Sequence, residues 1–260
     1  MTAERLRRGA GVAAIVAVLF VLWEFGERWY DARRTAAGMT SLTVLVPTPS
    51  MIFNEGWAQF LLMQEAITST LIKAGIGFGL GSTAAVLVAS LYTLVPWLRA
   101  LSLPLAYASN SFPVFGLVPV IVLAFGQDSI MTISVIAALL SYFPILITVD
   151  SALHRTPTDL LELGEIYSAS RWMRFRLIQF PTAVPALFVG LRLAAPASIV
   201  GATVGELLGS STGVGNIVAV ALYQLQSGLM YAMLIEVAVV CGLVALAATL
   251  LERKVSRWTS

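Results

Sequence analysis

Four ionisable side chains lie inside long apolar stretches of this sequence, where a charge is costly and usually has a purpose: Lys73, Arg192, Glu206 and Glu236. Arg192 is the best candidate to attract an anionic solute, with a structural role as the alternative. Glu206 is placed to line a gate or to cap the segment that follows it. Lys73 lies near the end of its stretch, where a long side chain can reach the membrane surface.

The sequence contains no recognisable set of residues for covalent catalysis. The chain has one histidine and one cysteine, and their separation predicts neither a metal site nor a cysteine–histidine pair. No Gly-x-x-x-x-Gly-Lys-Ser/Thr motif is present to hold ATP phosphates. The glycine series from Gly75 to Gly81 lies in an apolar stretch, and its 75/79 and 77/81 pairs predict close helix packing. We therefore expect no enzyme, no metal and no cofactor in this chain.

One polar segment, residues 157–181, interrupts the apolar pattern. Asp159 with Glu162 three residues later resembles a capping box, which predicts that a short helix begins there. Ser168 and Ser170 offer a break and a second cap, and Pro181 closes the next helix. Leucines near the start of the first helix suit insertion into a groove on another protein. The alternative is an amphipathic loop on the membrane surface.

Long uncharged runs supply the elements that would hold these residues. The chain is 58% hydrophobic and only 12% charged, and its uncharged runs reach the roughly 20 residues that a spanning helix needs. They lack the two-residue alternation of a membrane barrel. The sequence predicts an all-α polytopic protein of six transmembrane helices, forming one domain over 1–260 with its core at 66–251. The predicted helices cover about 9–27, 66–93, 100–125, 129–149, 182–206 and 228–251.

Basic residues set the predicted orientation. With a cytoplasmic N-terminus, eleven basic residues fall inside and three outside, which satisfies the positive-inside rule and predicts that both termini are cytoplasmic. Residues 28–65 and 207–227 are then extracytoplasmic, the second as a loop or partial helix. The inside residues are Arg5, Arg7, Arg8, Arg99, Arg155, Arg171, Arg174, Arg176, Arg253, Lys254 and Arg257; the outside ones are Arg28, Arg33 and Arg34.

The polar segment resembles the cytoplasmic signature of inner-membrane permeases from binding-protein-dependent ABC importers. That signature is Glu-Ala-Ala, three residues, Gly, nine residues, Ile, one residue, Leu-Pro. Here Glu162 stands at the Glu, Leu163-Gly164 at the alanines, Ser168 at the Gly, Ile178 at the Ile and Phe180-Pro181 at the Leu-Pro. Ala169-Ser170-Arg171-Trp172 resembles the usual continuation. Glycine at such a turn supplies a positive φ, so serine is expected to cap there instead.

Further matches to the branch that handles nitrate, sulfonates, taurine and pyrimidine vitamin precursors run in order over residues 46–208. They are Val46-Pro47-Thr48-Pro49-Ser50, the 110–119 segment, Phe143-Pro144-Ile145-Leu146, Gly190-Leu191-Arg192-Leu193-Ala194 and Glu206-Leu207-Leu208. The resemblance implies a type I importer permease, with a pathway near Asn110, Phe112, Pro113, Phe115, Arg192 and Glu206.

The resemblance also implies partners. Two permease subunits, as a homodimer or with a second, different permease, would form the pathway for a small and anionic solute. The coupling residues Asp159, Glu162, Leu163, Gly164, Ser168, Ala169 and Arg171 would contact a separate ATPase that holds ATP and Mg. An extracytoplasmic binding protein would deliver the solute at the bacterial inner membrane, with no nucleic acid involved. The alternative is a self-contained secondary transporter, although the two halves lack the matching broken helices of that class.

Overall fold

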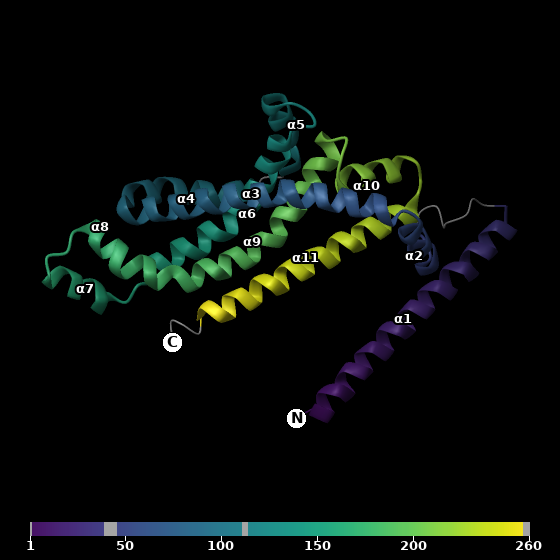
Figure 1. Ribbon diagram of the computed structural model, residues 1–260, viewed down its shortest axis with the longest axis horizontal. Coiled ribbons are helices and arrows are strands. Elements are labelled where there is room, and N and C mark those ends of the chain that lie inside the picture. Colours follow the sequence, from purple (N-terminus) through teal and green to yellow (C-terminus); the bar gives the residue numbers. More distant parts are fainter. Residues whose placement is uncertain (1, 39–45, 111–113, 257–260) are drawn as a thin grey trace. The chain divides into compact units, whose positions relative to one another are not determined.

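The computed structural model describes residues 2–38, 46–110 and 114–256, which are helical with short connections and contain no strand (Figure 1). Four helices are long and apolar enough to cross a membrane: Phe60–Leu94, Ile130–His154, Arg171–Gly209 and Ser227–Lys254. The all-α polytopic class is confirmed. In order, the elements are α1 Thr2–Ala36, α2 Pro49–Ala58, α3 Phe60–Leu94, α4 Pro96–Asn110, α5 Val114–Phe125, α6 Ile130–His154, α7 Thr158–Ile166, α8 Arg171–Arg174, the π-helix η1 Phe175–Gln179, α9 Phe180–Gly209, α10 Val214–Tyr223 and α11 Ser227–Ser256.

The predicted helices correspond to these elements with longer bounds. The span at 9–27 lies within α1, and the one at 100–125 corresponds to α4 and α5, on either side of residues 111–113, which are outside the described part. The 28–65 region contains a helix that the sequence did not predict, α2. Pro49 stands at its first turn, where proline costs no hydrogen bond, and the Thr48 hydroxyl accepts from the Met51 N–H at 3.4 Å. In the 207–227 region the partial helix is α10.

The described chain forms two compact units, Met1–Gln64 with Ile217–Glu236, and Glu65–Asn216 with Val237–Ser260. In the larger unit α6 and α9 pack along each other, and α3 lies against α6. A Cβ on Gly77 would lie 2.5 Å from both the Ser134 carbonyl oxygen and the Ala137 Cβ, so only glycine allows this approach. Gly75 and Gly79 have no such neighbour. The predicted close-packing face is therefore the 77/81 pair alone.

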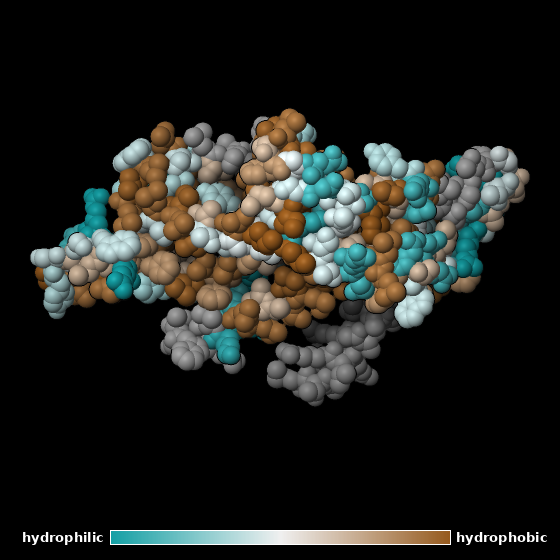
Figure 2. All heavy atoms as spheres, turned by 45° about the horizontal axis from the view of Figure 1, so that its top comes forward, coloured by the Kyte–Doolittle hydropathy of each residue, from teal (hydrophilic) through white to brown (hydrophobic). Residues whose placement is uncertain are grey.

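The core of the larger unit is narrow because most of its apolar surface faces outward. Its largest fully buried side chains come chiefly from α6, including Ile133, Ile136, Ile145 and Leu146. Large apolar side chains stay exposed along α3 and α11, and Figure 2 shows apolar residues spread over the displayed face. A soluble protein rarely exposes so much contiguous apolar surface, whereas lipid or a partner helix covers it in a membrane.

The smaller unit joins α1 to α2 through a carboxylate. Glu24 of α1 accepts hydrogen bonds from the Ser50 N–H at 3.0 Å and from the Ser50 hydroxyl at 2.7 Å. Arg28, one turn later on α1, pairs with the same carboxylate at 2.5 Å. The negative charge thus meets the positive end of the α2 dipole as well as an arginine.

Candidate functional site

The first candidate site is the polar segment of residues 157–181, which begins with the short helix α7 followed by α8. The helix begins two residues earlier than the capping-box prediction requires, at Thr158. Pro157 occupies the N-cap without a side-chain hydrogen bond, and its carbonyl accepts from the Leu160 N–H at 3.2 Å. Asp159 therefore lies within the first turn, where its charge complements the helix dipole, and the capping-box prediction is wrong.

A Schellman turn ends α7. The Ala169 N–H donates to the Gly164 carbonyl at 2.9 Å, and Ser168 adopts φ +52° between them. The left-handed conformation that glycine would supply is therefore retained at Ser168, contrary to the expectation that the serine caps. The cap of α8 is Ser170, whose hydroxyl accepts from the Met173 N–H at 3.3 Å. That second cap was predicted.

Arg174 fixes α7 against α8. A Cβ on Gly164 would lie 3.0 Å from the Arg174 side-chain carbons, so the missing methyl group makes room for the arginine. The Arg174 guanidinium then reaches Glu165, at 2.5 Å. On the inner side of this hairpin, Leu161 and Arg171 line a cavity of about 170 Å³ together with Thr93 and Pro96, at the junction of α3 and α4.

The opposite face of α7 has no partner in the described chain. Ile166 and Tyr167 are 77% and 78% exposed, and Leu160 and Leu163 are also exposed. Glu162 is exposed beside them. The predicted coupling residues Asp159, Glu162, Leu163, Ser168, Ala169 and Arg171 thus lie on one hairpin, with Gly164 in its interior. Figure 1 shows α7 and α8 at one end of α6 and α9.

A charge cluster that the sequence did not single out holds this same end together. The Arg99 guanidinium donates to both carboxylate oxygens of Asp150, at 2.9 Å each, and joins α4 to α6. His154 lies one turn after Asp150 and contacts the same carboxylate at 3.2 Å. The sequence analysis did not identify Asp150 as a paired residue, because it directly follows a 21-residue uncharged run.

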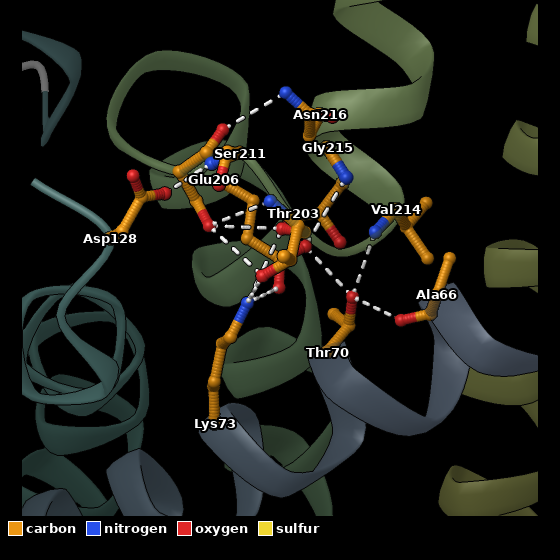
Figure 3. A network of polar contacts seen from close by, with 12 residues as sticks. Ala66, Thr70, Lys73, Asp128, Thr203, Glu206, Ser211, Val214, Gly215 and Asn216 are labelled. Atoms are coloured by element: carbon orange, nitrogen blue, oxygen red, sulfur yellow. Dashed lines mark hydrogen bonds and ion pairs between the residues drawn. The ribbon is translucent and has the colours of Figure 1, made fainter.

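The second candidate site is a buried charge network at the other end of α3 and α9 (Figure 3). Glu206 is fully buried, and Lys73 is 6% exposed. Their charged groups are 2.8 Å apart. The second Glu206 oxygen accepts from the Thr70 hydroxyl at 2.7 Å and from the Gly215 N–H at 3.2 Å. Lys73 therefore does not extend to a membrane surface, and the sequence-based expectation that it would is wrong.

The same network fastens the connection between α9 and α10. Lys73 Nζ donates to the Thr212 hydroxyl at 3.1 Å, and the Val214 N–H donates to the Thr70 hydroxyl at 3.0 Å. Gly213 has φ +96°, and a side chain there would meet the Glu206 carboxylate. Of the two roles predicted for Glu206, the structure shows the one in which it binds the segment after it.

Asp128 holds the outer edge of that connection. The Ser211 N–H donates to the Asp128 carboxylate, and the Asp128 N–H donates to the Gly209 carbonyl at 3.1 Å. The backbone hydrogen bond from Ser211 lowers the pKa of the Asp128 carboxyl below its ordinary value.

The remaining pathway candidates are Arg192 and four residues around the junction of α4 and α5. Arg192 is paired with Glu252 of α11 at 3.0 Å, so its positive charge is offset within the chain. Phe112 and Pro113 lie outside the described residues, and Asn110 and Phe115 are at the adjoining ends of α4 and α5. Of the described side chains, Arg192 and Glu206 have separate charged partners, and the role of all these residues in a pathway stays a prediction.

Comparison with known proteins identifies the scaffold that carries these features. Residues 77–257 match the family described as binding-protein-dependent transport system inner membrane component. The chain belongs to this family. It is the transmembrane subunit of an ABC importer, a multi-pass inner-membrane transport protein rather than an enzyme. Such a subunit works with an ATPase and a solute-binding protein, which leaves no support for a self-contained secondary transporter.

Several curated proteins are similar over most of their length. The riboflavin transport system permease protein RibX of Chloroflexus aurantiacus is 29% identical over 95% of this chain and 90% of its own. The formylaminopyrimidine transport permease protein ThiX of Halalkalibacterium halodurans is 30% identical over 76% and 75%. The putative aliphatic sulfonates transport permease protein SsuC of Bacillus subtilis is 28% identical over 85% and 80%.

The fold is also that of a solved importer. A chain of the MetNI methionine ABC transporter in an inward-facing conformation superposes with a TM-score of 0.65 at 17% identity, over 76% of this chain and 98% of that one. The predicted type I permease architecture is confirmed.

Proposed function

We propose that α7 is the coupling helix of this permease and inserts its exposed apolar face into a cleft of the separate ATPase, which holds ATP and Mg. The single observation that carries the proposal is the outward face of α7. Ile166 and Tyr167 are more than three-quarters exposed, beside the exposed Glu165. An apolar face of this kind is stable when a partner covers it.

The contacts around α7 suit the transmission of movement. Arg174 and Gly164 fix α7 against α8, and α8 runs through η1 directly into α9. The tight packing of α6 on α9 and the Arg99–Asp150 pair then extend the same body. Displacement of α7 on closure of the ATPases would thus turn α6 and α9 together, as a rigid-body switch of the pathway.

Two such subunits, most simply two copies of this chain, would form the pathway, with both termini in the cytoplasm. The excess of basic residues on the predicted inner side supports this orientation. It also places the α7–α8 hairpin on the side where ATP is available.

The solute that we propose is a small nitrogen heterocycle of the vitamin or vitamin-precursor class. Two of the similar permeases are named for riboflavin and formylaminopyrimidine transport. The Arg192–Glu252 ion pair removes the main reason for a fixed anion site within this chain. Sulfonates are the second candidate, because another similar permease is named for them.

Copurification with the cognate ATPase tests the coupling assignment. Tyr167→Ala and Ile166→Asp should each weaken the complex severalfold without changing the melting temperature of the permease, since both side chains are exposed. Glu162→Lys should also weaken it. Tyr223→Ala, at an 87% exposed residue of α10, is the matched control and should have no effect. A complex that survives scrambling of residues 158–170 would overturn the assignment.

The solute is tested on the partner binding protein. Its melting temperature should rise with riboflavin or formylaminopyrimidine. A rise with aliphatic sulfonates alone would select the second candidate, and a rise with nitrate alone would exclude both.

A further inference from the structure

A stripe of aromatic side chains runs along α2 and into the start of α3. Phe53 and Trp57 are 69% and 74% exposed, and Phe60 is also exposed. Their rings form a continuous series, with centroids 6.4 Å apart from Phe53 to Trp57 and 6.3 Å apart from Trp57 to Phe60. Leu61 extends the same apolar surface.

The other side of α2 is the one that packs on the protein. Ile52 is buried, and a Cβ on Gly56 would lie 3.3 Å from the Ala232 Cβ of α11. The aromatic stripe is therefore an outward face of the described smaller unit rather than an unfinished part of its core. A contiguous exposed patch of three large aromatic side chains indicates a surface that something else covers.

The neighbouring end of α1 indicates where this face lies. Exposed apolar side chains from Ile15 to Phe25 are followed by Trp29 and Tyr30 and then by arginines. The Arg33 guanidinium lies 4.0 Å from the Trp29 ring centroid, and Arg34 lies 6.0 Å from that of Tyr30. This order of apolar, aromatic and basic residues is typical of a helix that leaves the hydrocarbon layer for the lipid headgroups.

Hydrogen bonds hold α2 at that level. Ser50, in its first turn, is bonded to Glu24, and Arg28, next to Trp29 in the chain, donates to the Ser50 hydroxyl at 3.2 Å. Its C-terminal end is one residue from the start of α3, a membrane-spanning helix. α3 has 35 residues and is therefore roughly 50 Å long, enough to cross the bilayer, so α2 lies at the membrane surface where α3 begins.

We propose that α2 lies in the interfacial layer of the outer leaflet, with Phe53, Trp57 and Phe60 inserted at the boundary between headgroups and acyl chains. The occupant of the aromatic face is lipid. A docking site for a soluble binding protein would be expected to carry a polar rim around its apolar centre. Here the stripe continues directly into the apolar side chains of a spanning helix. The choice of the outer leaflet rests on the proposed orientation, in which residues 28–65 are extracytoplasmic, whereas the insertion of the aromatic face into lipid depends neither on it nor on the coupling role of α7.

Spin labels on α2 test the proposal in the full chain, reconstituted in nanodiscs of phosphatidylcholine and phosphatidylglycerol. In a Cys241→Ser background, Phe53→Cys and Trp57→Cys report the aromatic face. Asn54→Cys, an exposed neighbour about 100° around the helix from Phe53 and about 60° from Trp57, is the matched control. Collision rates with oxygen and with a water-soluble nickel chelate give the depth, calibrated with lipids that carry labels at known carbons.

The oxygen-to-nickel ratio should be severalfold higher at residues 53 and 57 than at residue 54, and should match lipids labelled near the headgroup. A ratio at 53 and 57 equal to that at 54 would show that the face is in water and would overturn the proposal. Exclusion of both reagents from 53 and 57 would show burial in a protein contact, and would overturn it as well.

Discussion

Removal of the positive charge from the Lys73–Glu206 pair should destabilise the permease strongly. Lys73→Met preserves much of the side-chain volume but leaves the fully buried Glu206 carboxylate without its counter-charge. Breaking a buried ion pair on one side typically costs about 3–5 kcal/mol. The Thr70 hydroxyl and the Gly215 N–H still donate to the carboxylate, so we expect the lower end, about 3 kcal/mol.

The assay is thermal unfolding of the detergent-purified chain, followed by tryptophan fluorescence. At about 2–4 °C per kcal/mol for a chain of this size, Lys73→Met should lower the melting temperature by about 6–12 °C. Glu206→Gln in the Lys73→Met background should restore part of the loss, because no charge then stays buried. Arg155→Met, at an exposed residue, is the control and should change it little. If Lys73→Met has the same melting temperature as this control, the buried network does not contribute the stability that its burial implies.

Three further predictions concern the backbone and pH. Ser168→Gly should stabilise the turn after α7 by up to about 1 kcal/mol, since glycine adopts the observed φ of +52° without steric cost. A lower melting temperature of this variant would contradict the Schellman assignment. Gly77→Val should disrupt the α3–α6 contact and reduce the yield of folded protein. Gly75→Val should not, because a Cβ at residue 75 meets no atom within 4 Å. Equal yields of the two variants would argue against the close approach of α3 and α6. The pKa of Asp128 is lowered in the folded state, so its hydrogen bond with Ser211 contributes stability at neutral pH that is lost as pH falls through that pKa. Asp128→Asn should therefore make the melting temperature depend less on pH in the acid range. An unchanged pH dependence there would refute this role.

The sequence was sufficient to predict the class of fold because long apolar runs have few solutions in lipid. It also predicted the position of the α7–α8 hairpin, since charges, serines and Pro181 interrupt that pattern locally. It did not predict α2, because Thr48-Pro49-Ser50 reads equally well as a turn and as a capped helix start. The capping box failed because Pro157 starts the helix first.

The sequence alone could not predict which charged residues pair with one another. Lys73 and Glu206 are 133 residues apart, and Arg192 and Glu252 are distant as well. Each side chain is a reasonable solute contact when considered alone. Only the packing of α3 and α11 on α9 shows that both are paired with a charge of the same chain, and their role in a solute pathway stays a prediction.

ATP-driven uptake in proteoliposomes tests the central claim most directly. The chain is reconstituted with its cognate ATPase, with ATP enclosed on the hairpin side and the loaded binding protein on the other. The account predicts that solute accumulates only with all three proteins and ATP, and that Tyr167→Ala uncouples uptake in proportion to its loss of ATPase binding. Uptake that persists without the ATPase, or that is unaffected when residues 158–170 are scrambled, would contradict it.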